Sequence, residues 1–403
     1  VFDELWKTWP EPLRSRAETA TAAERRRMAF SRYGLMEDPA SPGTGTALGY
    51  VNDGRGGWVM NCMACHSGKV AGQVIVGLPN SHYALQTLTE EVRATKLRMG
   101  KKLAHMDLAN FKLPLATTNG TTNAVIFGIV LGALRDADMN VIDGESGPLM
   151  HHDMDAPPWW HYRKRSTLYI DGFSPKNHRV LMQFMLLPSN DRQDVLAMQD
   201  DFRAIEAFIE SVEPPRYPWA IDNPLAEKGR TVFEKNCAEC HGTYGEHPTY
   251  PERMVPIDVI GTDPVRLHAL TPQARQKVKE SWMSYYGEQE VVTEPEGYVA
   301  PPLDGVWATA PYLHNGSVPT LWHLLRPDDR PTVWRRSEDG YDRRRMGLEV
   351  EMFDRVPSGV KTPAERRWYF DTRRPGKSAG GHRFPDVLTE DEKRAVLEYL
   401  KTL

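Results

Sequence analysis

The chain of 403 residues contains only four cysteines, and they fall into two copies of one short pattern. The first copy is Cys62-Met63-Ala64-Cys65-His66 and the second is Cys237-Ala238-Glu239-Cys240-His241. In each copy two residues separate the cysteines, and a histidine follows directly. Because every thiol of the chain lies in one of these patterns, they constrain its fold more than any other feature.

The C-x-x-C-H pattern favours covalent attachment of haem. Its spacing lets two thiols bind the two vinyl groups of one haem, while the next imidazole reaches the iron from the same turn. A redox-active thiol pair, a four-thiolate zinc site and disulfides are the alternatives. The first two need no histidine after the second cysteine, and disulfides do not require the tight spacing. The sequence therefore predicts two covalently bound haem c groups, with His66 and His241 as the proximal iron ligands.

Charge and hydropathy exclude several classes of partner. The 50 Lys and Arg residues against 54 Asp and Glu residues give a formal net charge of −4. No strongly basic surface is expected, and so no nucleic-acid partner. The longest apolar run, 124–134, is shorter than the roughly 20 residues of a membrane-spanning helix, so we expect no membrane span. The sequence opens without the pattern of a signal peptide, which we expect to be absent from this chain.

Helical patterns accompany each cysteine motif. Residues 225–236 read as a helix that leads into Cys237, with a small Gly229 that permits a close helix crossing. The last helix begins with a capping box from Thr389 to Glu392. The segment 213–224 contains four prolines and is the predicted linker. We predict a mainly α fold with two cytochrome c-like haem domains, 1–212 and 213–403, and long irregular loop insertions.

Several insertions exceed what a minimal haem domain needs. A glycine-rich stretch at 43–57 predicts a long loop before Cys62. The run 124–134 predicts a buried helix near the haem, or the wall of a substrate channel. The arginine-rich segment 335–345 is predicted as a solvated loop. Extra chain around one haem suggests a pocket or a partner surface.

Longer strings resemble a known family. The chain is similar to the dihaem superfamily of bacterial cytochrome c peroxidases and MauG-type enzymes, most closely to its rubber-oxygenase-like branch. The strings that carry the resemblance lie at 229–233 (GRTVF), 260–264 (IGTDP), 307–321 (WATAPYLHNGSVPTL), 77–80 (GLPN), 155–160 (DAPPWW) and 381–384 (GHRF).

This resemblance implies a periplasmic or secreted oxidoreductase. The first haem would activate peroxide or dioxygen, as in a peroxidase or oxygenase, and the second, six-coordinate haem would transfer electrons. The implied partners are a small cytochrome or cupredoxin and a small organic substrate. Calcium is a further implied cofactor, with the segment around Asp153 and Asp155 as a solvated loop or ion contact. The alternative is a plain dihaem electron carrier without catalysis.

The resemblance also implies roles for histidines far from the motifs. His382 matches the late histidine that completes bis-histidine coordination of the second haem. His314 is expected near a haem edge, without being a ligand. His82 lies at a position similar to that of a detachable ligand of the first haem, although the neighbouring string 77–80 resembles the branch in which that face is open. Both possibilities stay open for His82.

Aromatic residues complete the set of candidates. Trp159 and Trp160 follow two prolines and resemble the tryptophan that relays electrons between haems in this superfamily. Burial in the core is the alternative for this pair. Phe173 corresponds to the aromatic lining of the distal pocket in the oxygenase branch.

Overall fold

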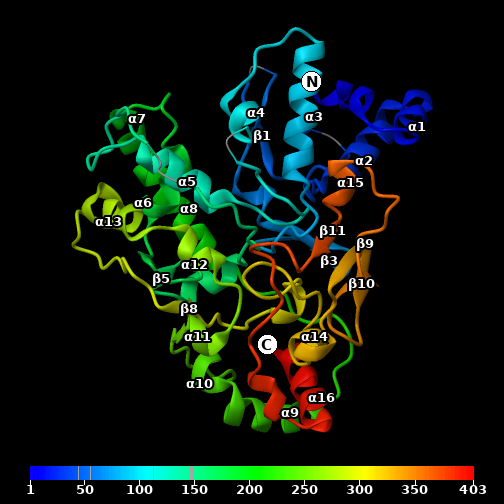
Figure 1. The fold of residues 1–403 in the computed structure, drawn as a ribbon, viewed down its shortest axis with the longest axis vertical. Helices are drawn as coiled ribbons and strands as arrows, with labels where there is room; N and C mark the ends of the chain where they lie inside the picture. Colours follow the sequence, from blue (N-terminus) through cyan, green and yellow to red (C-terminus); the bar gives the residue numbers. More distant parts are fainter. Residues whose placement is uncertain (44, 55, 112, 146–148) are drawn as a thin grey trace.

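The computed structural model describes residues 1–43, 45–54, 56–111, 113–145 and 149–403. Helices make up 40% and strands 13%, with irregular loops between them, which confirms the predicted predominance of helix. The molecule is elongated, with the N-terminal helices at one end and the C-terminal helix at the other (Figure 1).

The first half consists of short helices joined by hairpins and long loops. Its helices are α1 (Leu13–Thr19), α2 (Ala22–Tyr33), α3 (Leu85–Arg98), α4 (His105–Ala109), α5 (Ala124–Ala133), α6 (His178–Leu181), α7 (Arg192–Ala197) and α8 (Gln199–Ser211). Its strands form three two-stranded antiparallel hairpins: β1 (Tyr50–Asn52) with β2 (Trp58–Met60), β3 (Ser67–Val70) with β4 (Gln73–Val76), and β5 (Thr167–Leu168) with β6 (Ser174–Pro175).

The second half begins and ends with a helix. Its helices are α9 (Asn223–Asn236), α10 (Ala238–His241), α11 (Ile257–Ile260), α12 (Val265–Ala269), α13 (Pro272–Glu280), α14 (Leu321–Leu324), α15 (Pro363–Arg366) and α16 (Glu390–Tyr399). Its strands are β7 (Met254–Pro256) and β8 (Gly297–Val299), which pair with each other, and the three-stranded sheet of β9 (Val333–Asp342), β10 (Gly347–Phe353) and β11 (Tyr369–Asp371).

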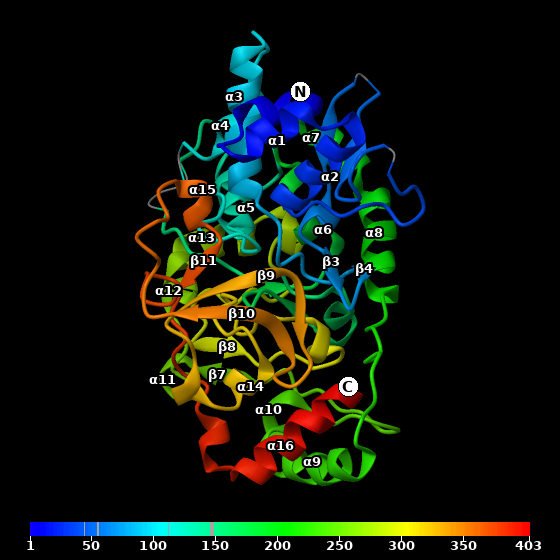
Figure 2. The same ribbon diagram turned by 90° about the vertical axis from the view of Figure 1, so that its right-hand side faces the viewer.

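Helices α9 and α16 cross at one end of the molecule, as predicted (Figure 2). A Cβ added at Gly229 would lie 1.9 Å from the carbonyl oxygen of Ala395, so only glycine allows this approach. The capping box of α16 is present, with Thr389 accepting from the N–H of Glu392. The crossing holds the residues that precede Cys237 against the C-terminal helix.

The prediction of a solvated loop at 335–345 is wrong, because β9 occupies most of this segment. The strand lies between β10 and β11 in an antiparallel sheet. Trp334 is buried and stacks on Phe370 with ring centroids 5.1 Å apart, whereas Arg335 pairs with Glu351 on the more exposed side. An arginine-rich sequence thus forms a strand because one of its faces is covered.

One core cluster spans both halves of the chain. Val70, Leu78 and Trp160 from the first half pack with Trp307 and other buried residues of the second half. Ion pairs and hydrogen bonds also cross between the halves, as from Arg336 to Ser81, Arg367 to Glu90 and Lys377 to Asp153. The two predicted domains are therefore interlocked rather than merely joined by a linker.

The proline-rich segment 213–224 is irregular up to Asp222, and its last two residues begin α9. It is packed rather than loose: the carbonyl of Pro215 accepts a hydrogen bond from the Trp307 indole at 2.8 Å, and Trp219 stacks on Tyr341. The boundary between two domains at this segment stays a prediction. Within the described ranges, no helix is both long enough and apolar enough to cross a bilayer.

Candidate haem-binding sites

The first C-x-x-C-H pattern forms a tight turn. Residues Cys62–Ala64 make a short 3₁₀ helix, which Asn61 caps by accepting from the N–H of Met63 at 2.8 Å. The Nδ1 of His66 lies 3.0 Å from the carbonyl oxygen of Pro157. Because a carbonyl accepts, this nitrogen carries the proton, and Nε2 keeps its lone pair for a metal. Burial lowers the pKa of His66 to about 4, so its imidazole is neutral.

Asn80 holds this turn in place from the neighbouring loop. Its buried side-chain amide donates to the carbonyl oxygens of Ala64 at 3.0 Å and Gly34 at 2.9 Å, and its backbone N–H donates to Cys65 at 2.8 Å. Asn80 belongs to the string 77–80 that resembles the family, but its supporting role was missed from sequence. The bonds reach carbonyls that no local pattern identifies.

Two tryptophans connect the first site to the second half of the chain. Trp159 stacks on the His66 ring with centroids 5.4 Å apart and an angle of 27°. Trp160 is fully buried, and its indole N–H donates to the carbonyl oxygen of Asp304 at 2.7 Å. Asp304 lies three residues after Pro301, which contacts the second site. The pair is both part of the core and a bridge between the two motifs.

The second C-x-x-C-H pattern lies at the end of α9 and in α10. The Nδ1 of His241 is 2.8 Å from the carbonyl oxygen of Pro301, so this histidine has the same tautomer as His66. Burial lowers its pKa as well. All four cysteines of the chain are free thiols in this structure. The donor sets at both patterns therefore fit covalently bound haem c with a neutral proximal imidazole.

His382 lies opposite His241. Their ring centroids are 6.2 Å apart with an angle of 60° between the rings. An imidazole nitrogen is about 1.1 Å from its ring centre and about 2 Å from a bound metal, so two imidazoles on opposite sides of one metal have centroids about 6 Å apart. The distance fits the predicted bis-histidine pair. Burial and then the charge of His241 lower the pKa of His382 to about 3, which keeps it neutral.

The loop that carries His382 has an unusual conformation. His382 has a φ of 48°, in the left-handed region that disfavours residues with a Cβ. Its N–H donates to Ile260 at 2.7 Å. A Cβ on Gly381 would lie 2.2 Å from the carbonyl carbon of Gly261, so the two glycines allow the loop to approach α11. The surrounding contacts hold this strained conformation.

Arg330 makes two of the hydrogen bonds that hold the His382 loop. No sequence pattern identified this residue. Its guanidinium donates to the carbonyl oxygens of Ala379 at 2.6 Å and Gly381 at 2.8 Å, in the His382 loop. It also donates to the carbonyl oxygens of His323 and Leu324, at the end of α14. One side chain thus ties the His382 loop to the rest of the second half. Burial lowers the pKa of Arg330 to about 10, so it stays charged at neutral pH.

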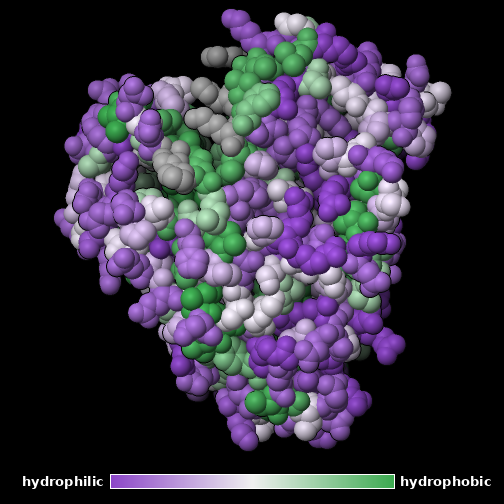
Figure 3. All heavy atoms as spheres, in the orientation of Figure 1, coloured by the Kyte–Doolittle hydropathy of each residue, from purple (hydrophilic) through white to green (hydrophobic). Residues whose placement is uncertain are grey.

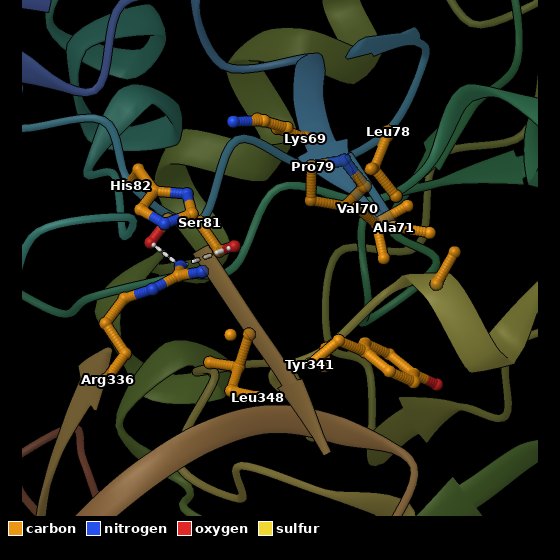
Figure 4. A pocket seen from close by; sticks show the side chains of 13 residues that line it. Lys69, Val70, Ala71, Leu78, Pro79, Ser81, His82, Arg336, Tyr341 and Leu348 are labelled. Carbon is orange, nitrogen blue, oxygen red and sulfur yellow. Dashed lines mark hydrogen bonds between the residues drawn. The ribbon is translucent and has the colours of Figure 1, made fainter. Parts of the chain in front are cut away.

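His82 lines a pocket at the junction of the two halves (Figure 4). The pocket has an empty volume of about 380 Å³, part of which is open to solvent. Its walls come from β3, which begins directly after His66, and from β9 and β10. Arg336 closes one side by donating to the hydroxyl of Ser81 at 2.7 Å. The structure thus brings His82 next to the first site, within a pocket that also carries Lys69 and Arg336.

His314 and Phe173 have separate surroundings in the structure. The His314 ring is 4.6 Å from the Tyr298 ring, and its carbonyl accepts from the N–H of Asp155 at 2.9 Å. Burial, and then the charge of Arg266, lower the pKa of His314 to about 3. Phe173 is buried against Leu270 and Val291. From the sequence we expect it in the distal pocket of the first haem. That role of Phe173 stays a prediction.

The acidic segment around Asp153 is not a solvated loop. His152 and Asp153 are each 1% exposed, and Asp153 forms a 2.6 Å ion pair with the buried Lys377. Tertiary contacts from residues far away in the chain cover this segment. Among the described residues, no three His, Cys, Asp or Glu side chains are grouped so as to hold a metal ion. The expected calcium site stays a prediction.

Comparisons with known proteins identify one part of the chain. Residues 297–335 match a family model described as RoxA-like, cytochrome c-like. This segment contains Pro301, His314 and Arg330, which contact or surround the second site. Two uncharacterized proteins of Sinorhizobium fredii are similar over longer stretches. Protein y4iM is 28% identical over 288 residues, 62% of this chain and 64% of that protein. Protein y4iJ is 31% identical over 261 residues, 48% of this chain and 41% of that protein.

The chain therefore spans less than two thirds of the length of either relative. The family match agrees with the cysteine patterns and with the tautomers of both proximal histidines. Together they support a RoxA-like, cytochrome c-like segment at residues 297–335, and such a segment implies covalently bound haem c.

Proposed function

We propose that this chain is a periplasmic oxidoreductase that binds two haem c groups and uses them differently. The first, bound by Cys62, Cys65 and His66, would activate peroxide or dioxygen. The second, bound by Cys237, Cys240, His241 and His382, would transfer electrons. The observation that carries the proposal is the 6.2 Å distance between the His241 and His382 rings, because two histidines on one iron leave no position for a substrate.

The first site lacks this arrangement of rings in the part of the chain that the structure describes. His66 stacks on Trp159, and the pocket lined by His82, Lys69 and Arg336 lies beside the strand that follows His66. A haem iron with an open or exchangeable position binds dioxygen or peroxide, whereas a six-coordinate iron transfers electrons. The cations and the small volume of the pocket favour a small oxidant and a small organic substrate.

The residues between the sites offer a continuous connection for electrons. Trp159 contacts His66, Trp160 follows it, and the Trp160 indole donates to Asp304. The backbone from Asp304 leads back to Pro301, whose carbonyl accepts from His241. Each step is a covalent bond, a hydrogen bond or a ring contact. We propose that Trp159 and Trp160 serve as the relay and keep the two rings rigid through burial.

The compartment and the partners follow from the cofactor. Covalent haem attachment through C-x-x-C-H patterns is carried out outside the bacterial cytoplasm in the family that this chain resembles, so we propose a periplasmic or secreted protein. A small cytochrome or cupredoxin would supply or accept the electrons. The RoxA-like match supports the oxygenase branch of the proposal, although peroxide reduction would use the same residues.

Electron paramagnetic resonance and optical spectra of the purified holoprotein test the proposal. The wild type should contain one low-spin bis-histidine centre and one centre that binds cyanide or, when reduced, carbon monoxide. His382→Ala should convert the low-spin signal into a high-spin one, whereas His247→Ala, which alters an exposed histidine, should leave both signals unchanged.

Two results would count against the proposal. An unchanged spectrum of His382→Ala would remove the second-site assignment. If neither iron binds an exogenous ligand in either oxidation state, the chain is an electron carrier and not an enzyme.

A further inference from the structure

A buried group of charges is centred on Arg266, which follows Ile260 in the chain, and the carbonyl of Ile260 accepts from the N–H of His382. Asp171 is fully buried between two arginines, at 3.1 Å from Nη1 of Arg266 and 2.8 Å from Nη2 of Arg275. Arg266 is 1% exposed and Arg275 is 3% exposed. Both arginines come from the helical segment α12–α13, whereas Asp171 lies between β5 and β6. One carboxylate therefore serves two guanidinium groups.

The donors of Arg266 exceed the acceptors around it. A guanidinium has five N–H bonds. Arg266 uses Nη2 for a 3.2 Å hydrogen bond to Asp171, and its Nη1 lies in the ion pair with the same carboxylate. Its Nε is buried and makes no hydrogen bond with any described residue. Buried donors without a partner are costly, so native structures rarely keep them. This side chain is built to bind a further acceptor.

The neighbouring acids do not supply that acceptor. Asp263 accepts from the backbone N–H groups of Val265 and Ser378, both at 2.9 Å, and Asp153 pairs with Lys377. The nearby histidines are neutral: burial and the charge of Arg266 lower the pKa of His152 to about 4. The Nε2 of His152 is also buried without a hydrogen bond. The surroundings of Arg266 thus favour an anion that the protein itself does not provide.

The position of Arg266 connects it to the haem held by His241 and His382. The segment 260–263 precedes α12, and the carbonyl oxygen of its first residue, Ile260, accepts a hydrogen bond from the N–H of His382. Tyr298, which donates to Asp263 and packs against His314, lies three residues before Pro301, the acceptor of His241. Ile260 thus lies shortly before Arg266 in the chain, and Tyr298 connects the same segment with strand β8, which leads to Pro301.

We propose that Arg266 binds a carboxylate, and that this carboxylate is a propionate of the second haem. The inference rests on the proposed second site and extends it to residues that no motif marks. Arg275 and Asp171 act as positioning residues, since they fix the guanidinium of Arg266. A planar guanidinium suits a carboxylate because the two form paired, charge-assisted hydrogen bonds.

Redox titration of the second haem, followed optically in the holoprotein, tests this assignment. The positive charge of Arg266 favours the reduced iron over the oxidised iron. Arg266→Gln removes this charge, so the midpoint potential of the second haem should fall. Arg266→Lys keeps the charge and should shift the potential less. Arg253→Gln is the control, because it removes one charge near the same cysteine motif, where Arg253 is exposed and pairs with Glu239. Solvent and salt screen that exposed charge.

Resonance Raman spectra of the propionate bending modes provide a second readout that does not need the Gln variant to fold. The mode should shift in Arg266→Lys relative to wild type, because an ammonium makes a different hydrogen bond. The proposal is wrong if neither the potential nor the bending mode responds to changes at Arg266 while the low-spin His241–His382 signal is intact. Absence of the low-spin signal from the wild-type spectrum would instead show that the proposed bis-histidine coordination of the second haem is wrong.

A free anion is the other source of a carboxylate or phosphate. Acetate and phosphate are therefore titrated into wild type and Arg266→Gln at constant ionic strength. If the site is filled by the haem, neither anion should change the Soret band of the wild type. A saturable change in the wild type that is absent in Arg266→Gln would assign the site to a free anion and overturn the proposal.

Discussion

At the scale of single residues, two aspartates close in sequence experience opposite environments. Burial alone would raise the pKa of Asp153, but the charge of Lys377 and the hydrogen bond from His151 outweigh it and hold that pKa well below its usual range. One carboxylate oxygen of Asp155 is buried and accepts no hydrogen bond from the described residues, and burial raises the pKa of Asp155 well above its usual range. The first acid is a carboxylate at neutral pH, whereas the second is harder to ionise.

These shifts predict opposite pH dependences of stability. A carboxyl group whose pKa is lowered by folding stabilises the folded state at pH values above its unfolded pKa of about 4. This stabilisation is lost as the pH falls toward the folded pKa. Asp153→Asn should therefore lower the free energy of unfolding at pH 7 by about 3–5 kcal/mol, because Lys377 loses its partner. The deficit should shrink toward pH 3. Urea unfolding at several pH values measures it.

Asp155→Asn is the matched variant with the opposite sign. A raised pKa stabilises the folded state below about pH 4, and this stabilisation is lost as pH rises through the folded value. Relative to wild type, Asp155→Asn should therefore become more stable as pH increases from 4 to 7. Parallel pH curves for the wild type and Asp155→Asn would contradict the assignment.

At the scale of elements, the crossing of α9 and α16 depends on one missing side chain. Gly229 lies in the interior of α9, where glycine costs about 0.5–1 kcal/mol relative to alanine. The close approach of Ala395 outweighs this cost, since a Cβ at Gly229 would overlap with its carbonyl. The same helix leads into Cys237, so the crossing also fixes the start of the second motif.

We therefore expect Gly229→Ala to destabilise the protein by about 1–3 kcal/mol, as in other overpacked cores. Gly132→Ala is the control: Gly132 is also helical, in α5, and an added Cβ would meet nothing within 4 Å. This control should gain about 0.5–1 kcal/mol. Thermal or urea unfolding of the two variants measures the difference, and equal effects would show that the crossing does not depend on Gly229.

At the scale of the whole molecule, the two halves share one core. Trp160 of the first half is buried among Trp307 and other residues of the second, and the sheet of β9, β10 and β11 lies against the first half (Figure 2). On the face shown in Figure 3, apolar residues form a broken band that runs from the upper end toward the lower end, between polar surfaces.

This arrangement predicts that the chain unfolds as one unit. Residues 213–403 alone would expose Trp307 and leave Arg336, Arg367 and Lys377 without their partners in the first half. Calorimetry of the holoprotein should show a single transition, and proteolysis within 213–224 should not release two stable halves. Two separate transitions, or a stable fragment 213–403 with its haem spectrum, would contradict this expectation.

The sequence by itself determined the two turns that present two cysteines and a histidine, the capping box of α16 and the small residue at the α9–α16 crossing. Each of these depends on residues within one or two helical turns, so local patterns reveal them. His382 was also selected from sequence, but only through its resemblance to a family, because no pattern connects it to His241.

Only the tertiary structure decided what surrounds those turns. The carbonyls that orient the histidines lie 91 residues from His66 and 60 residues from His241. Arg330, Arg266 and the opposite environments of Asp153 and Asp155 likewise depend on which distant segments cover them. Burial and charge at a point sum contributions from all segments packed there, and a linear sequence does not state which segments meet. This is also why most of 335–345 forms a strand, since its partners β10 and β11 and the residues that cover Trp334 come from other segments of the chain.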